Sequence, residues 1–153
     1  NFRLRYFPRL GGLLFLFFLP PISVFSADDP TPKSNKISQN FYQQGRGFVS
    51  QGKWSNAIES FKKAIQKDKK DHKAFNLLGY SLRQSGENSQ AIIAYNQSLK
   101  LKPNYEEALE YRAIAFARIG KKEKAMQDYN KLLSLKSSLS DGLKEKIIRN
   151  LNK

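Results

Sequence analysis

The sequence contains no cysteine, which excludes disulfide bonds, a thiol nucleophile and a thiolate metal site. Its single histidine, His72, excludes any site in which two histidines hold a metal ion. Glycine-rich phosphate loops, nucleophile elbows and the spacings of metal ligands are missing as well. We therefore expect no catalytic residues, no cofactor and no metal site, and we predict that the protein is not an enzyme.

Acidic residues are scarce: the chain has 13 of them against 27 lysines and arginines, for a net charge of +14. Removing residues 1–26 would take away three arginines and no acid, so the charge would fall from +14 only to +11. Such a basic surface could attract an acidic protein, a lipid head-group layer or nucleic acid, or it could simply keep a small domain soluble. Nucleic acid is not expected, because no aromatic residues are interleaved with the charge.

An apolar run covers residues 10–19, follows three arginines and ends at two prolines. Small residues then occur at Val24 and Ser26, which suits cleavage after Ser26. A basic start, an apolar core and small residues at the cut are typical of a secretory signal peptide. The alternative is an uncleaved membrane anchor over residues 10–25, although a spanning helix needs roughly 20 apolar residues. We predict that residues 1–26 are a signal peptide and that the protein is exported, to a periplasm, the extracellular space or an organelle lumen.

A polar segment, residues 27–37, follows and contains two prolines but no apolar periodicity. It is predicted to be a disordered linker, with the first helix beginning at Ser38.

Equivalent residue types then recur every 34 residues over three copies. Turn glycines, large apolar residues, small residues and aromatic residues all keep this register: Gly52, Gly86 and Gly120; Phe48, Leu82 and Phe116; Ala57, Ala91 and Ala125; Phe61, Tyr95 and Tyr129. A 34-residue period indicates a solenoid of paired helices.

The middle copy resembles the tetratricopeptide repeat, whose pattern has Leu-Gly after a large aromatic, then Ala-x3-Phe and a closing proline. The matching residues are Phe75, Leu78, Gly79, Leu82, Ala91, Tyr95 and Pro103. The outer copies depart from the pattern at Gln44, Lys69, Arg112 and Ser137, as terminal repeats with a solvent-facing side do. The resemblance implies an all-α, right-handed superhelical solenoid with repeats at 38–71, 72–105 and 106–139, and a capping helix within 140–153.

Polar residues at the expected helix starts predict caps. Asp71 is expected to cap one helix, and Asn88 or Ser89 the next. Asn104 with Glu107 is expected to form a capping box. Apolar stripes that include Leu132 and Leu133, and later Leu143, Ile147, Ile148 and Leu151, are predicted to face inward.

In this family the concave face, lined by the first helix of each repeat, is the usual ligand surface. The positions predicted to face outward there are Gln39, Tyr42, Arg46, Val49, Lys73, Asn76, Tyr80, Arg83, Glu107, Glu110, Ile114 and Arg118. Tyrosine and arginine are enriched at binding hot spots. We predict a partner-binding groove formed by Tyr42, Arg46, Lys73, Asn76, Tyr80, Arg83, Glu110 and Ile114; the alternative is that these are ordinary solvated residues.

One known ligand mode of the family is not expected. Repeats that bind the acidic C-terminal tail of heat-shock chaperones use Lys, Asn, Asn, Lys and Arg at five set positions. The matching residues here are Tyr42, Arg46, Leu77, Glu107 and Tyr111. Only one is a cation, and Glu107 would repel a carboxylate.

Trp54, His72 and one group of acidic residues are expected to have structural roles and no metal-binding or catalytic role. Trp54 is expected to pack at a helix start, and His72 lacks a second metal ligand. The acidic group Glu106, Glu107 and Glu110 suits the positive end of a helix. The predicted function is therefore a non-enzymatic scaffold of the cell envelope or secretory space that binds a protein or peptide segment. The alternative is a basic adaptor that uses convex lysines on an anionic surface, with membrane contact only through an uncleaved N-terminus.

Overall fold

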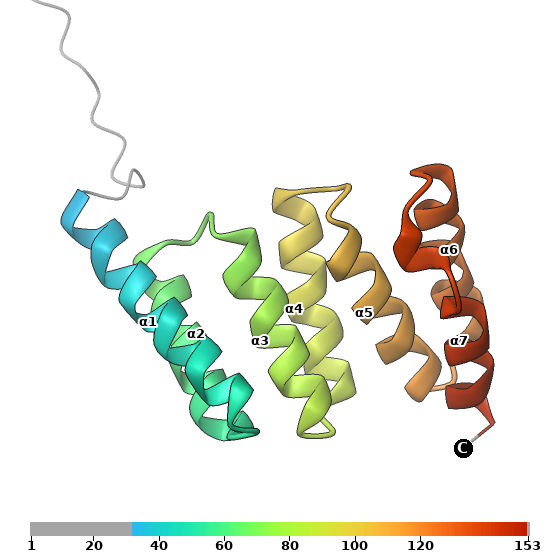
Figure 1. Ribbon diagram of the computed structural model, residues 1–153, viewed down its shortest axis with the longest axis horizontal. Helices are drawn as coiled ribbons and strands as arrows, with labels where there is room; N and C mark the ends of the chain where they lie inside the picture. Colours follow the sequence, from blue (N-terminus) through green and yellow to red (C-terminus); the bar gives the residue numbers. More distant parts are fainter. Residues whose placement is uncertain (1–31, 153) are drawn as a thin grey trace, which may run out of the picture.

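The computed structural model describes residues 32–152, and within that range every regular element is a helix (Figure 1). The elements are α1 (Pro32–Ser50), α2 (Trp54–Lys67), α3 (His72–Gln84), α4 (Asn88–Leu101), α5 (Glu106–Arg118), α6 (Lys122–Ser134), the 3-10 helix η1 (Ser138–Ser140) and α7 (Leu143–Leu151). The prediction of an all-α chain with a last capping helix is confirmed. None of the helices described is both long and apolar enough to cross a bilayer.

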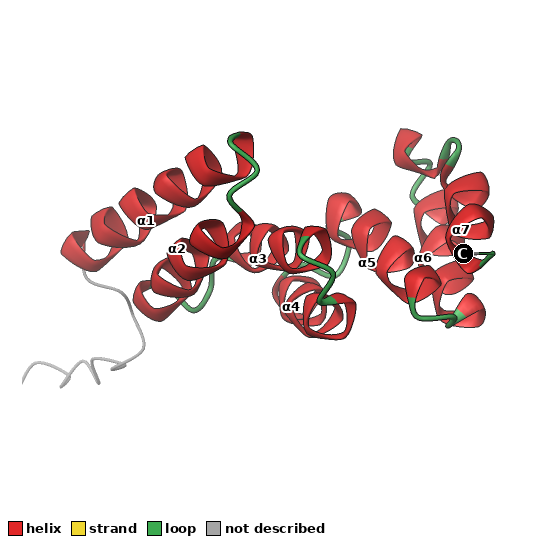
Figure 2. Ribbon diagram, turned by 90° about the horizontal axis from the view of Figure 1, so that it is seen from below, coloured by secondary structure: helices red, strands yellow, loops and turns green. Residues whose placement is uncertain are grey.

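The helices pack as three pairs in a row. The partners are α1 with α2, α3 with α4 and α5 with α6, and adjacent pairs touch through α2 and α3 and through α4 and α5. At the end of the row α7 packs on α5 and α6. Seen from below, α1 and α3 lie on one side of the first two pairs and α2 and α4 on the other (Figure 2). This is the predicted helical solenoid.

A glycine with positive φ lies in the turn between the two helices of each pair. These residues are Gly52 at +68°, Gly86 at +90° and Gly120 at +73°. In each turn the N–H of the next residue donates to a carbonyl five residues back over 2.9 Å: Lys53 to Phe48, Glu87 to Leu82 and Lys121 to Phe116. This geometry satisfies a carbonyl at the helix end and needs a left-handed residue, which glycine adopts without strain. The 34-residue spacing of these glycines is thus a spacing of identical turns.

Small residues let the two helices of a pair approach closely. A Cβ built on Gly45 would lie 2.7 Å from the ring of Phe61, and one on Gly79 would lie 2.6 Å from the ring of Tyr95. Both rings are fully buried. In the third pair Ala113, also fully buried, occupies the equivalent position.

The first helix begins earlier than the sequence predicts. Residues 32–37, assigned to the disordered linker, form the first turns of α1, whereas residues 27–31 and the predicted signal peptide or anchor lie outside the described residues. Two serine hydroxyls fix these turns to α2: Ser34 donates to the carbonyl of Lys67 over 2.8 Å, and Ser38 to that of Ala64 over 3.1 Å. These contacts come from tertiary packing, so apolar periodicity could not reveal them.

The predicted caps are only partly right. The Asp71 carboxylate accepts hydrogen bonds from the backbone N–H groups of Lys73 (2.9 Å) and Ala74 (3.0 Å), as expected. The residues that precede α4 and α5 are Glu87 and Tyr105, and neither makes a side-chain cap. The capping box of Asn104 and Glu107 is therefore wrong, because α5 starts one residue later than the box requires; the prediction for Asn88 or Ser89 is also wrong.

Two residues assigned to inward stripes are exposed, Leu133 to 47% and Ile148 to 46%. Their chain neighbours Leu132 and Ile147 are fully buried. Adjacent helix positions differ by about 100° around the axis, so one residue of each pair faces the stack and the other is turned away from it.

Candidate functional site

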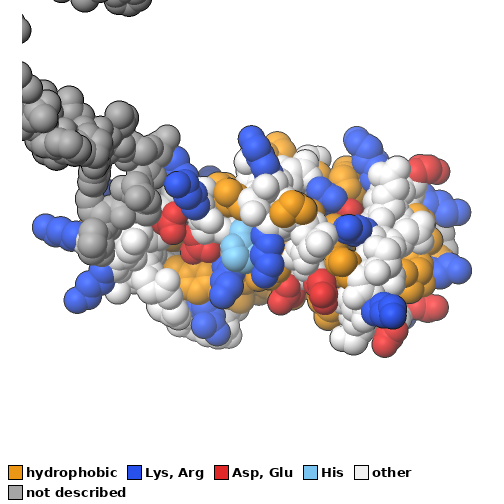
Figure 3. Space-filling view, turned by 90° about the horizontal axis from the view of Figure 1, so that it is seen from above, with side chains coloured by type: hydrophobic (Ala, Val, Ile, Leu, Met, Phe, Trp, Pro, Cys, Tyr) orange, Lys and Arg blue, Asp and Glu red, His pale blue; other side chains and the backbone are white. Residues whose placement is uncertain are grey.

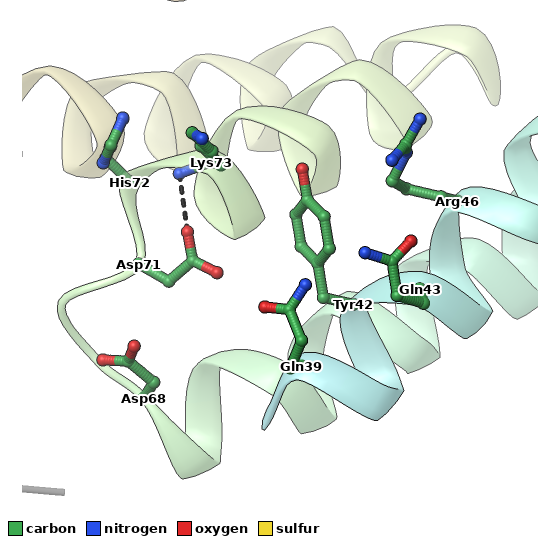
Figure 4. A pocket seen from close by; sticks show the side chains of 8 residues that line it. All are labelled: Gln39, Tyr42, Gln43, Arg46, Asp68, Asp71, His72 and Lys73. Carbon is green, nitrogen blue, oxygen red and sulfur yellow. Dashed lines mark hydrogen bonds between the residues drawn. The ribbon is translucent and has the colours of Figure 1, made fainter. Parts of the chain in front are cut away.

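A cleft of about 490 Å³ lies between α1 and the start of α3 (Figure 4). It is lined by Gln39, Tyr42, Gln43, Arg46, Asp68, Asp71, His72 and Lys73. The structure therefore brings together three residues of the predicted groove, Tyr42 and Arg46 from α1 and Lys73 from α3. The aspartates come from the segment between α2 and α3, which the prediction did not include.

Tyr42 is the central side chain of this cleft. Its ring packs edge-on against Phe61, with the centroids 6.0 Å apart. Burial, and then the charge of Asp71, raise the pKa of the Tyr42 hydroxyl, which therefore keeps its proton as a hydrogen-bond donor. In Figure 4 the hydroxyl points away from α1, between Lys73 and Arg46. The cleft thus offers a fixed aromatic surface with cations near it.

The two aspartates of the cleft accept hydrogen bonds from backbone N–H groups. One oxygen of Asp71 accepts from the α3 backbone as the N-cap, and one oxygen of Asp68 accepts from the N–H of Lys70 over 2.8 Å. Neither aspartate forms an ion pair within residues 32–152. Lys73 and Arg46 thus keep their charges for another group.

Further along the solenoid, aromatic rings from different helices make a continuous cluster. Tyr80 on α3 contacts Trp54 on one side (centroids 6.1 Å apart) and Tyr111 of α5 on the other (5.4 Å). Tyr111 also contacts Tyr95 of α4 (6.3 Å). The guanidinium of Arg83 lies over the rings of Tyr80 and Tyr111, 5.3 and 5.5 Å from their centroids. We call these residues the Arg83 cluster.

Three residues that were predicted to face outward are buried. Asn76 is 3% exposed, Arg83 is 6% exposed and Glu110 is 9% exposed. Glu110 is paired with Lys146 of the capping helix, with 3.0 Å between Nζ and Oε1. The prediction treated each first helix as a free surface, but the next helix in the stack covers part of it.

The other predicted residues remain accessible to different degrees. Tyr42, Tyr80 and Ile114 are half-buried, whereas Arg46, Lys73 and Arg118 are exposed. Arg118 is held in place, because its Nη1 donates to the carbonyl of Arg83 over 3.0 Å. The predicted groove is thus divided into the cleft around Tyr42 and the Arg83 cluster.

Two members of the cluster, Trp54 and Tyr111, were not predicted as groove residues. Tyr111 is one of the five positions that match the chaperone-tail site of the family, and Trp54 was predicted to pack at a helix start. Trp54 is half-buried and does pack, but against Tyr80 of the groove. Since Tyr80 and Tyr111 occupy different positions within their repeats, the repeat alignment did not show that their rings would meet.

Basic side chains are spread over the surface. On the face shown in Figure 3, lysines and arginines alternate with acids, and His72 lies among them. One arginine is part of a buried ion pair: Arg112 donates from Nε and Nη2 to the two oxygens of Asp128, over 2.9 and 2.6 Å. Within residues 32–152, no group of three or more histidine, aspartate or glutamate side chains could hold a metal ion.

Comparisons with known proteins agree with this architecture. Models of the tetratricopeptide repeat match residues 42–106 and residues 107–135, which together make up more than half of the chain. No curated protein matches the sequence.

Several solved structures have a similar fold. The first tetratricopeptide repeat domain of Spaghetti (RPAP3) bound to an HSP90 peptide has a TM-score of 0.71 at 21% identity, covering 78% of this chain and 96% of that one. A TPR2B-domain:pHsp70 complex of yeast Sti1 has a TM-score of 0.66 at 15% identity, covering 76% and 94%. MamA has a TM-score of 0.64 at 22% identity, covering 78% of each chain. At these identities the similarity shows a shared fold.

Proposed function

The chain belongs to the tetratricopeptide repeat family, and we propose that it is a non-enzymatic interaction module that binds a protein or peptide segment on its concave face. The observation that carries this proposal is the cleft between α1 and α3, where Tyr42 is packed by Phe61 and Arg46 and Lys73 lack ion-pair partners among the described residues.

The physical properties of the face suit a protein segment. Tyr42, Tyr80 and Ile114 each leave part of a large side chain open to solvent. Their rings and branches are held by neighbours, so little side-chain entropy is lost when a ligand covers them. Arg46 and Lys73 can then select charge and fix the orientation of the segment. Peptide ligands in the Spaghetti and Sti1 structures add support for this use of the fold.

The ligand proposed here differs from the acidic chaperone tail. At the five positions of the chaperone clamp this chain has one cation, Arg46. Glu107 is exposed at the fourth position, and at the fifth the ring of Tyr111 contacts Tyr80 and Arg83. A segment with two adjacent terminal carboxylates would meet the Glu107 charge and only one of the five donors.

A second candidate is a basic adaptor for an anionic surface. It is favoured by the excess of 27 lysines and arginines over 13 acids and by exposed lysines on the outer helices and turns: Lys62, Lys63, Lys67, Lys69, Lys70, Lys121, Lys122, Lys124, Lys144 and Lys146. Binding through these lysines would weaken steeply as salt is added, whereas binding through the aromatic groove would weaken only modestly.

The proposed place of action is outside the cytoplasm. The support is the sequence pattern of residues 1–26, with arginines before an apolar run and small residues at the cut. N-terminal sequencing of the mature protein would test this separately: an N-terminus at Ala27 is expected, and a retained apolar segment would contradict cleavage.

The groove itself can be tested by photo-crosslinking in cells. A photoreactive residue placed at Tyr42 or Tyr80 is expected to give discrete adducts with a partner protein. The matched control is Ile93, which is 62% exposed on α4, the second helix of the middle repeat. Adducts of equal yield from Ile93, or none from either groove position, would rule out the concave face as the binding surface.

A further inference from the structure

Arg83 is a buried cation without an anionic partner in the part of the chain that the structure describes. It is 6% exposed, and its Nε makes no hydrogen bond. None of the three ion pairs among residues 32–152 includes it. A largely buried guanidinium without an anionic partner is unfavourable, so an anion supplied by a ligand would stabilise it.

The tyrosine rings do not supply the missing acceptor. Tyr80 and Tyr111 lie 5.3 and 5.5 Å from the Arg83 guanidinium carbon, measured to the ring centroids. The rings attract the cation but carry no anionic oxygen for its five N–H donors. They therefore hold the guanidinium in place without giving it an anionic partner.

The surroundings add donors and positive charge. The hydroxyl of Tyr95 is fully buried beside Arg83 without a hydrogen bond of good geometry. Burial raises its pKa, against the opposing effects of the Arg83 charge and of the Arg83 side chain as a donor. Arg118 is anchored to the carbonyl of Arg83, and burial followed by the Arg83 charge lowers the Arg118 pKa. Two arginines thus meet here without a carboxylate between them.

We propose that the Arg83 cluster binds the carboxylate of an aspartate or glutamate side chain in the partner segment. A carboxylate is flat and presents two oxygens to the guanidinium edge. The proposal rests on the groove-binding function and adds the chemical identity of one position in the ligand.

Peptide selection tests the proposal directly, because it does not require the partner to be identified first. Random dodecapeptides displayed on phage would be selected on the full chain, on Arg83→Met and on the control Arg149→Met, which removes an exposed arginine of α7 outside the groove. Peptides from the wild type and from Arg149→Met are expected to share an aspartate or glutamate at one position, and those from Arg83→Met are not. For the best synthetic peptide, replacing that glutamate by glutamine should weaken binding to the wild type by at least about tenfold. On Arg83→Met the same replacement should change binding by less than about twofold.

The outcomes separate this proposal from the groove itself. Selected peptides without a shared acid, or an equal loss on Arg83→Met, would overturn the assignment of Arg83 while leaving groove binding intact. A failure to select any peptide on all three proteins would instead remove the proposed function and the proposal with it. If Arg83→Met does not fold, Arg83→Lys serves as the second variant, since it keeps the charge but loses the planar pair of donors and should lose most of the acid preference.

Discussion

Gly79 lies directly beneath the ring of Tyr95, so that a Cβ on Gly79 would be 2.6 Å from Cε1 of that ring. The same arrangement occurs one repeat earlier between Gly45 and Phe61. The glycine thus sets how closely the two helices of a repeat can approach, and the buried aromatic residue fills the space between them.

The first prediction is that Gly79→Ala destabilises the protein although alanine favours helices. The added methyl group must displace a fully buried ring, and overpacking of this kind costs about 1–3 kcal/mol. Gly47→Ala is the matched control: nothing lies within 4 Å of its Cβ position in α1. This variant should gain about 0.5–1 kcal/mol from helix propensity. Urea unfolding of both variants measures the difference, and equal shifts would contradict the close-packing role of Gly79.

The second prediction concerns the capping helix. Ile147 is fully buried and should cost about 2–5 kcal/mol when replaced by alanine. The neighbouring Ile148 is 46% exposed and should change stability by less than about 0.5 kcal/mol on the same replacement. Thermal or urea unfolding followed by circular dichroism tests this pair. Similar losses from both would mean that α7 does not pack on the stack in this orientation.

A single cooperative transition is also expected for the Ile147→Ala variant, because each repeat is stabilised mainly by its neighbours. For the same reason, ending the chain after Ser140 should lower the stability of the whole stack. If the truncated protein melted at the wild-type temperature, the capping role of α7 would be disproved.

The third prediction is that removing one partner of the buried ion pair between Arg112 and Asp128 destabilises the fold. Asp128→Ala should cost about 3 kcal/mol, because it leaves Arg112 without its two-oxygen partner in a largely desolvated position. The comparison is Glu59→Gln, which breaks the fully exposed pair with Lys63 and should not change stability measurably. Denaturant midpoints distinguish the two, and an unchanged midpoint for Asp128→Ala would contradict the prediction.

The fourth prediction follows from the burial of His72. Its Nε2 has no partner, its ring lies edge-on to Tyr105 with centroids 4.7 Å apart, and burial followed by the charge of Lys102 lowers its pKa. Because the folded pKa is below the ordinary value of 6.5, the unfolded chain binds the proton more readily. The stability contributed by neutral His72 should therefore be complete above pH 6.5 and be lost as the pH falls through the folded pKa.

Since the chain has one histidine, its imidazole titration can be followed by NMR without assignment. The nearby charged groups are Lys102, Lys73, Asp71 and Glu107; Tyr105 remains neutral because burial, and then Glu107, raise its pKa to about 12. In His72→Gln the dependence of stability on pH should flatten near and below pH 6.5. An imidazole pKa above 6.5 would contradict the predicted direction.

The fold could be predicted because its determinants are local and repeated. A left-handed turn at Gly52, Gly86 and Gly120 and a small residue under a buried ring depend on residues close in the chain or in its helix partner. Their 34-residue register then requires identical helix pairs to stack. The missed start of α1 shows the limit of such signals: Pro32 begins the helix because serine hydroxyls reach carbonyls of α2, a contact without a sequence period.

The binding surface was predicted less completely, because exposure on a concave face depends on how far the next helix leans over it. Of the predicted groove residues, Tyr42, Arg46 and Lys73 line one cleft. Repeat positions placed Asn76, Arg83 and Glu110 in solvent, whereas packing of α5 and α7 buries them. The periodicity of the side chains therefore sufficed to determine which face of each helix points inward, and the packing of the next helix decided how much of each groove residue stays exposed.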